Sequence, residues 1–85
     1  MKIRKDFIGH SSDGAYYLVG TSASGFNGIL KGNKTAGCVI ELLRNDMSRD
    51  GLVNAMAGRF DAPADVIARD VDMIIEKLKS AGALE

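Results

Sequence analysis

The hydrophobic and polar positions follow two different periods along the chain, and the change comes near Asn33. Before it, short apolar runs alternate with glycine-rich and polar stretches, a pattern typical of strands and hairpins. We predict a first strand at Phe7-Ile8, a second over Ala15–Val19, and a third over Phe26–Leu30. The polar segment from Ser11 to Gly14 is expected to form the turn between the first two strands.

After Asn33 the apolar residues recur at helical spacing, and three helices are predicted. Asn33 or Thr35 caps the first helix, Ser48 caps the second, and the third runs from about Pro63 to Ser80. The residues expected to face the core are Ala36, Val39, Ile40 and Leu43, then Leu52, Val53, Met56 and Phe60, then Ile67, Val71, Ile74 and Leu78, with Ile75 alongside.

Three strands followed by three helices predict an α+β fold with the architecture of a winged-helix-like domain: three N-terminal antiparallel strands and a three-helix cluster. The chain has 85 residues, 46% of them hydrophobic and 26% charged, which is an ordinary globular composition. At this length we expect one domain, with strands in residues 1–33 and helices in residues 34–85. Such a domain buries about 60–65% of its unfolded surface, enough for one core but not for a deep, enclosed active site.

The charges and the single cysteine narrow the class of protein further. Eleven basic and eleven acidic residues give a net charge of zero, without the excess positive charge of a nucleic-acid binder. Cys38 has no partner for an internal disulfide or a cysteine metal cluster, which indicates a reducing compartment. The basic start of the chain is not followed by the apolar stretch of a signal peptide, and no segment reaches the length of a membrane span. We therefore expect a cytoplasmic protein that does not engage a membrane.

The residues that could carry chemistry do not form a catalytic pattern. His10 has Ser11, Ser12 and Asp13 beside it, but consecutive residues rarely converge as a triad, so an exposed loop histidine is expected. Cys38 is expected to be a small buried hydrophobe. The carboxylates of the third helix alternate with basic residues, as on a solvated face. We predict no catalytic residue, no metal site and no cofactor, and therefore no enzyme activity.

One ordered set of segments resembles a known family. It begins with residues 26–37, followed by Glu41-Leu42-Leu43, and continues through residues 47–53, residues 60–63 and the stretch from Asp70 to Leu84. This order resembles the PqqD-like family, which comprises coenzyme PQQ synthesis protein D and its relatives, the peptide-recognition elements of ribosomally made, modified peptides. The likeness covers about residues 7–85.

The resemblance implies a non-catalytic domain that binds the leader of a precursor peptide and presents it to a modifying enzyme, often a radical SAM enzyme. In the family the leader adds as an antiparallel strand to the third strand, over a groove closed by the third helix. Here the edge would be Phe26–Lys31, with Gly28 allowing another backbone to approach closely. The predicted peptide-binding residues are Phe26, Asn27, Gly28, Ile29, Leu30, Lys31, Val66, Asp70, Met73, Ile74 and Lys77.

Several alternatives stay open at this point. Val66 and Met73 could simply widen the core face of the third helix. The edge of the third strand could be covered by the N-terminal segment or by a second copy of the chain, as in a homodimer. A winged-helix transcription regulator is the alternative function, although the third helix carries four acidic residues against three basic ones. An interaction domain that has lost its peptide role is a third option.

Overall fold

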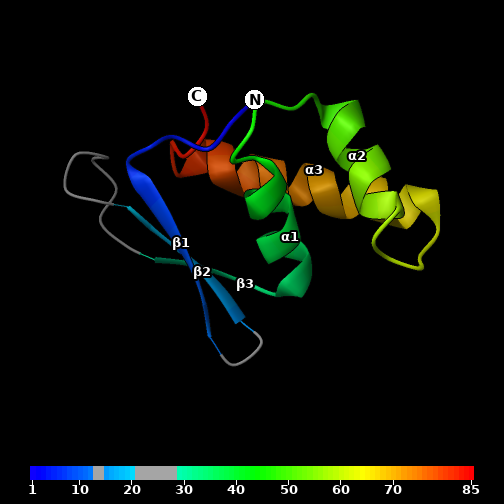
Figure 1. The fold of residues 1–85 in the computed structure, drawn as a ribbon, viewed down its shortest axis with the longest axis horizontal. Helices are drawn as coiled ribbons and strands as arrows, with labels where there is room; N and C mark the ends of the chain where they lie inside the picture. The colour runs from blue at the N-terminus through cyan, green and yellow to red at the C-terminus, as the bar shows by residue number, and fades with distance from the viewer. Residues whose placement is uncertain (13–14, 21–28) are drawn as a thin grey trace.

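The computed structural model describes residues 1–12, 15–20 and 29–85, and it places the first of three helices against one face of a three-stranded sheet, with the other two helices packed on the first and on each other (Figure 1). The α+β class and the element order are therefore confirmed. The elements are β1 (Phe7–Ser12), β2 (Ala15–Gly20), β3 (Ile29–Gly32), α1 (Lys34–Leu42), α2 (Arg49–Ala57) and α3 (Ala64–Ser80).

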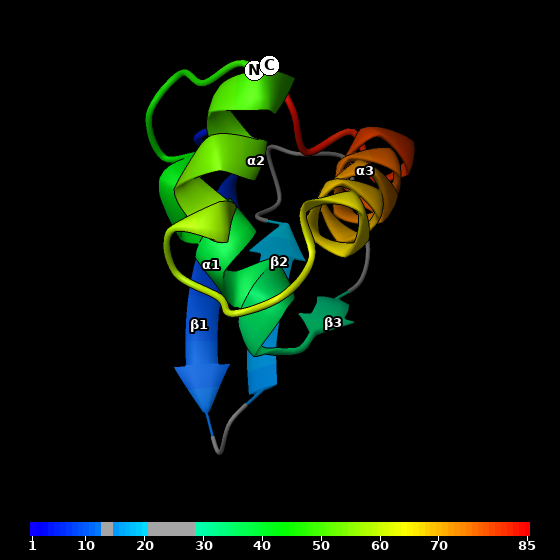
Figure 2. The ribbon, with the colours of Figure 1, turned by 90° about the vertical axis from the view of Figure 1, so that its right-hand side faces the viewer.

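The sheet is antiparallel, with β2 in the middle and β1 and β3 at the two edges. Side chains alternate between its faces: Phe7 and Leu18 are buried against the helices, whereas Ile8 is 59% exposed on the opposite face. One face of the sheet therefore contributes to the core. Among the described strands β3 is an edge strand, and it lies below α3 in Figure 2.

Two of the strand predictions were wrong in extent. Ser11 and Ser12 of β1 pair with Tyr16 and Ala15 of β2. The two serines therefore extend the first strand and do not form a turn. His10 is likewise an exposed strand residue, not a loop residue. An edge strand with one solvated face accepts such polar residues, which is why composition alone was misleading. The other half of the predicted turn, residues 13–14, lies outside the described residues.

The third strand also differs from its predicted bounds. Its described part continues through Gly32, and Gly32 pairs with Tyr16 of β2. Residues 26–28, the predicted start of this strand, lie outside the described residues. A Cβ on Gly32 would lie 2.6 Å from the Cβ of Ala36, so glycine allows α1 to start directly beside the end of β3.

The helix starts follow from their capping residues. The Asn33 side chain accepts a hydrogen bond of 3.0 Å from the Ala36 amide, so Asn33, not Thr35, caps α1. The Ser48 hydroxyl accepts a bond of the same length from the Gly51 amide and caps α2, as predicted.

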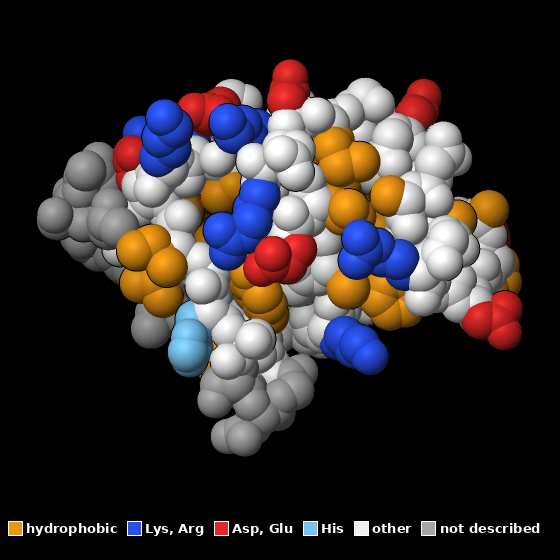
Figure 3. Space-filling view, in the orientation of Figure 1, with side chains coloured by type: hydrophobic (Ala, Val, Ile, Leu, Met, Phe, Trp, Pro, Cys, Tyr) orange, Lys and Arg blue, Asp and Glu red, His pale blue; other side chains and the backbone are white. Residues whose placement is uncertain are grey.

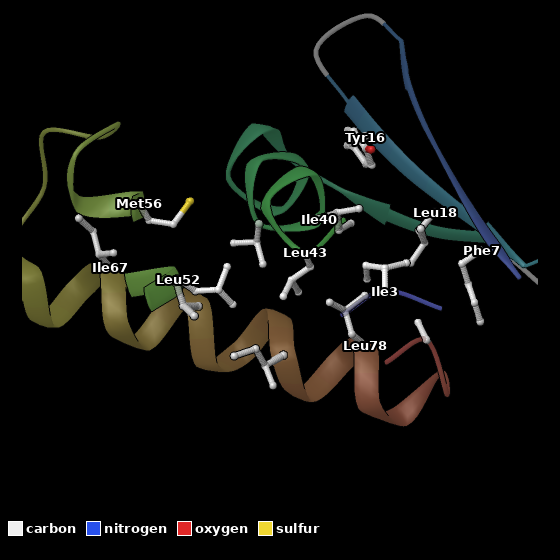
Figure 4. Packing of buried hydrophobic residues seen from close by; sticks show 14 residues of the cluster. Ile3, Phe7, Tyr16, Leu18, Ile40, Leu43, Leu52, Met56, Ile67 and Leu78 are labelled. Atoms are coloured by element: carbon white, nitrogen blue, oxygen red, sulfur yellow. The ribbon is translucent and has the colours of Figure 1, made fainter. Parts of the chain in front are cut away.

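The core runs between the inner face of the sheet and the three helices (Figure 4). In α3 the buried residues are Ile67, Val71, Ile75 and Leu78. The prediction that Ile74 lies in the core and Ile75 beside it was wrong: Ile74 is only partly buried. Val53 and Phe60 are likewise only partly buried, and Phe60 lies beyond the end of α2. Cys38 too is partly rather than fully buried.

The two ends of the described chain lie together, away from β3 (Figures 1 and 2). Ile3 forms an isolated antiparallel bridge with Leu84, and its amide donates to the Leu43 carbonyl at 2.9 Å. The N-terminal ammonium donates to Asp46 Oδ1 at 2.8 Å. The N-terminal segment therefore does not cover the edge of β3, which rules out one of the alternatives above. None of the described helices combines the length and apolarity that a membrane span needs.

Candidate functional site

A groove of about 580 Å³ lies between the end of β3, the start of α1 and the C-terminal half of α3. We call it the β3–α3 groove. Its walls come from three elements that the core holds in place, because α3 packs on α1 and α2 through its buried stripe. The lining residues are Ala15, Lys31, Gly32, Asn33, Thr35, Ala36, Ile40, Asp70, Met73, Ile74, Lys77 and Leu78.

Apolar side chains from α1 and α3 line this groove. Ile40 and Leu78 are largely buried and form its inner surface, whereas Ile74 is half-buried and Met73 is 55% exposed. A long, unbranched thioether at the mouth can change rotamer to fit different side chains. The groove can therefore receive an apolar side chain while one of its walls adapts.

Three charged residues stand at the groove: Lys31 from β3, and Asp70 and Lys77 from α3. Within the described ranges none of the three takes part in an ion pair. The ion pairs between described residues lie elsewhere: the N-terminus with Asp46, Arg4 with Asp6, Arg44 with Glu41, and Arg49 with Asp50 and Asp72. No described residue therefore neutralises Lys31, Asp70 or Lys77.

The open edge of β3 forms one side of the groove. In an antiparallel ladder, alternate residues direct their N–H and C=O groups to opposite sides of the strand. Over Ile29–Gly32 half of the residues therefore direct their main-chain N–H and C=O groups to β2, and the other half direct theirs outward. No other strand of the described part of the chain pairs with that outer side. A further strand could dock there through main-chain hydrogen bonds.

The α1 wall is fixed to the sheet by Tyr16. Its hydroxyl donates a hydrogen bond of 2.8 Å to Glu41 Oε1, and Arg44 contacts the same carboxylate at 3.1 Å. Burial, followed by the bond to Glu41, raises the pKa of the Tyr16 hydroxyl. The same hydrogen bond lowers the pKa of Glu41. Sequence reasoning missed this contact, because the two residues lie 25 positions apart.

The comparisons with known proteins agree with this architecture. The family model for coenzyme PQQ synthesis protein D (PqqD) matches residues 14–84, most of the chain. The chain belongs to the PqqD family. No curated protein matches it at a significant level.

Two solved structures share the fold of this PqqD-family chain. One is described as TbiB1 in complex with the TbiA(beta) leader peptide; it is 16% identical, with a TM-score of 0.79 over 100% of this chain and 95% of the other. The second is a lasso peptide synthetase B1 complexed with the leader peptide; it is also 16% identical, with a TM-score of 0.74 over 96% of this chain and 93% of the other.

The structure brings together about half of the residues that the PqqD resemblance implied. Lys31, Asp70, Met73, Ile74 and Lys77 all line the β3–α3 groove. Ile29 and Leu30 are residues of β3. Val66 is 41% exposed on α3 and does not line the groove. The remaining three, Phe26, Asn27 and Gly28, lie outside the described residues.

Sequence reasoning missed the α1 wall of the groove. Asn33 was identified only as a cap, and Ala36 and Ile40 only as core positions, yet all three line the groove. The short connection from β3 into a capped helix was the available signal, since it places the first turn of α1 beside the end of β3. Within residues 1–12, 15–20 and 29–85 there is no cluster of three or more potential metal ligands.

Proposed function

We propose that this chain captures the leader of a precursor peptide by strand addition at β3 and presents it to a modifying enzyme. The observation that carries the proposal is the edge of β3, which pairs with no further strand of the described residues, beside a groove with apolar walls and charges that form no ion pair within those residues. Membership of the PqqD family supports it, and so does the shared fold with two proteins whose structures contain leader peptides.

The mechanism divides affinity and selectivity between backbone and side chains. The leader pairs with the outward N–H and C=O groups of β3, an interaction that is independent of sequence. Its side chains then alternate, and those on the inner side enter the β3–α3 groove against Ile74 and Met73. The proposed binding residues are Lys31, Asp70, Met73, Ile74 and Lys77, together with the strand edge over residues 26–31.

The chain binds and delivers, and chemistry belongs to its partner. We propose a cytoplasmic modifying enzyme in that role, with a radical SAM enzyme as the specific expectation from the family. A second copy of this chain on the β3 edge would compete with the leader, so the leader-binding form exposes that edge.

The DNA-binding alternative finds no support in the fold or the comparisons. The α3 helix is net acidic, and Arg49 of α2 is held by Asp72 and Asp50 instead of facing outward alone. On the face shown in Figure 3, basic and acidic side chains are interspersed rather than gathered into one basic stripe. Such a surface gives phosphates no continuous attraction.

The proposal is tested by two proline variants at neighbouring positions of β3. The protein is titrated with the leader of the precursor peptide encoded beside its gene, and binding is measured by fluorescence anisotropy. Adjacent residues send their N–H groups to opposite sides, so one of Ile29→Pro and Leu30→Pro removes an edge donor and the other removes a bond to β2. We expect the variant that loses the edge donor to fold but not to bind the leader. The variant that loses the bond to β2 should be less stable than the parent. If both variants bind the leader as the parent does, strand addition at β3 is wrong.

A further inference from the structure

The charged residues of the β3–α3 groove follow a fixed order along α3. Asp70 and Lys77 are seven residues apart, which is about 10.5 Å along a helix axis. Both line the groove, and Met73 and Ile74 line it between them. The groove therefore offers a negative group, an apolar surface and a positive group in succession.

The direction of a bound strand relative to this order can be read from the fold. The α3 helix runs in the opposite direction to β3, as the views along two perpendicular axes both show (Figures 1 and 2). A peptide that pairs antiparallel to β3 consequently runs parallel to α3. Its N-terminal part passes Asp70, its middle passes Met73 and Ile74, and its C-terminal part passes Lys77.

We infer that the captured segment carries a basic, then an apolar, then an acidic residue at alternate positions, in that order from N- to C-terminus. This inference rests on the proposed function. Alternate residues of a strand face one side, and positions i to i+4 span about 13 Å. The flexible Lys77 side chain covers the small excess over the spacing on α3. Lys31 adds a second positive charge at the strand side, so a further acidic residue in the segment is favoured.

These charges can select between ligands because no other described residue pairs with them. In the described ranges Asp70, Lys77 and Lys31 have no ion pair, whereas Arg49 of α2 is paired with Asp72, also on α3. Asp70 is half-buried, whereas Lys31 and Lys77 are exposed. Charges beside an apolar surface discriminate between ligands by attraction and by repulsion. A segment with the reversed order places like charges against both Asp70 and Lys77.

The test is a selection of random 12-residue peptides displayed on phage against the whole chain. Synthetic peptides with the selected sequence, with its two charges exchanged, and with both charges replaced by glutamine are then compared by fluorescence anisotropy. We expect enrichment of the basic–x–apolar–x–acidic order, and about five- to tenfold weaker binding of the exchanged peptide. The difference should shrink in 0.5 M salt.

Matched variants connect this preference to the groove. Asp70→Lys combined with Lys77→Glu should reverse the preference, and Asp70→Asn combined with Lys77→Gln should abolish it. Glu76→Lys combined with Lys79→Glu is the control, because these residues are exposed on the same helix, keep the same net charge and do not line the groove. The control should keep the parent preference.

The leader used for the proposed function serves as the binding standard. If the leader binds but peptides show no preference for charge order, or the Asp70/Lys77 exchange leaves the preference unchanged, this inference is wrong and the proposed function stands. If neither leader nor any displayed peptide binds, both are wrong.

Discussion

Tyr16 shows how one side chain fixes the position of α1 against the sheet. Its ring lies over Gly37 of α1, where an added Cβ would be 2.7 Å from the ring. A Cβ on Gly9 of β1 would overlap the Tyr16 hydroxyl. The ring therefore occupies a space that exists because both neighbours lack side chains, and Glu41 holds its hydroxyl.

The fit of this ring predicts the effect of Gly37→Ala. Alanine is the better helix former by about 1 kcal/mol, but the added methyl has to displace the Tyr16 ring, whose hydroxyl is bonded to Glu41. We expect a net loss of about 1–2 kcal/mol in the free energy of unfolding, measured with urea. Gly58→Ala is the control, since the added Cβ would meet its nearest atom at 3.6 Å. Equal stability of the two variants would contradict the packing described.

The environment of Tyr16 also predicts its titration. With Tyr17→Phe as background, tyrosinate absorbance reports Tyr16 alone among the two tyrosines. Because burial, followed by the bond to Glu41, raises the pKa of Tyr16, the midpoint of its titration should lie above the ordinary value of 10.0. Glu41→Gln should lower the Tyr16 pKa without returning it fully, since burial is the larger cause.

The sign of the stability change follows from that direction. A raised pKa in the folded state means that the unfolded chain releases the Tyr16 proton first. The contribution of the protonated hydroxyl to the free energy of unfolding is therefore fully present below pH 10, and it is lost as pH rises through the folded-state pKa. In Tyr16→Phe this alkaline loss should be smaller. Ionisation of Tyr16 at or below its ordinary value would disprove the burial argument.

At the scale of elements, α3 shows the limit of periodicity. Ile74 and Ile75 are about 100° apart on the helix, and both lie near the centre of the apolar stripe. The sequence therefore predicts that both belong near the core without deciding which is inside. Packing against α1 and α2 buries Ile75, and the groove on the other side leaves Ile74 half-exposed. Tertiary contacts, absent from a one-dimensional pattern, make that choice.

Two exposed apolar residues of α3 allow the effect of the groove to be distinguished from that of the general surface. Met73→Glu places a charge where the leader's apolar side chain is proposed to lie, and it should weaken leader binding at least about tenfold. Val66→Glu is the matched variant, because Val66 is exposed on the same helix but does not line the groove. Both proteins should unfold at the parent urea midpoint. Equal binding by the two variants would remove Met73 from the site.

At the scale of the whole molecule, the sequence predicts the element order and the class of fold well. Glycine-separated apolar runs, the Asn33 and Ser48 caps and the apolar stripes are local signals, and the structure contains the elements they predict. The bridge between Ile3 and Leu84 joins residues 81 positions apart, and the groove combines three separate elements. Such distant contacts leave no local pattern, so their partners could not be predicted from spacing.

The joined ends predict a large effect for a residue near the start of the chain. Ile3 is 9% exposed, bridges to Leu84 and packs in the core, so Ile3→Ala should lower the free energy of unfolding by about 2–4 kcal/mol. Ile8→Ala removes the same atoms from the exposed face of the sheet and should change it by less than about 0.5 kcal/mol. Urea unfolding measures both; a similar loss in the two would contradict the role of the N-terminal segment in the core.

The central claim is that a peptide strand docks between β3 and α3, and an NMR titration of the isotope-labelled chain tests it most directly. The leader of the precursor peptide encoded beside the gene is added to one sample and duplex DNA to another. We predict amide shifts over Ile29–Gly32 and along α3 from Asp70 to Lys77 with the leader, and new cross-strand contacts between leader and β3. Shifts with DNA centred on Arg49, Arg59 or Arg69, or leader-induced shifts confined to β1 and the N-terminal segment, would contradict it.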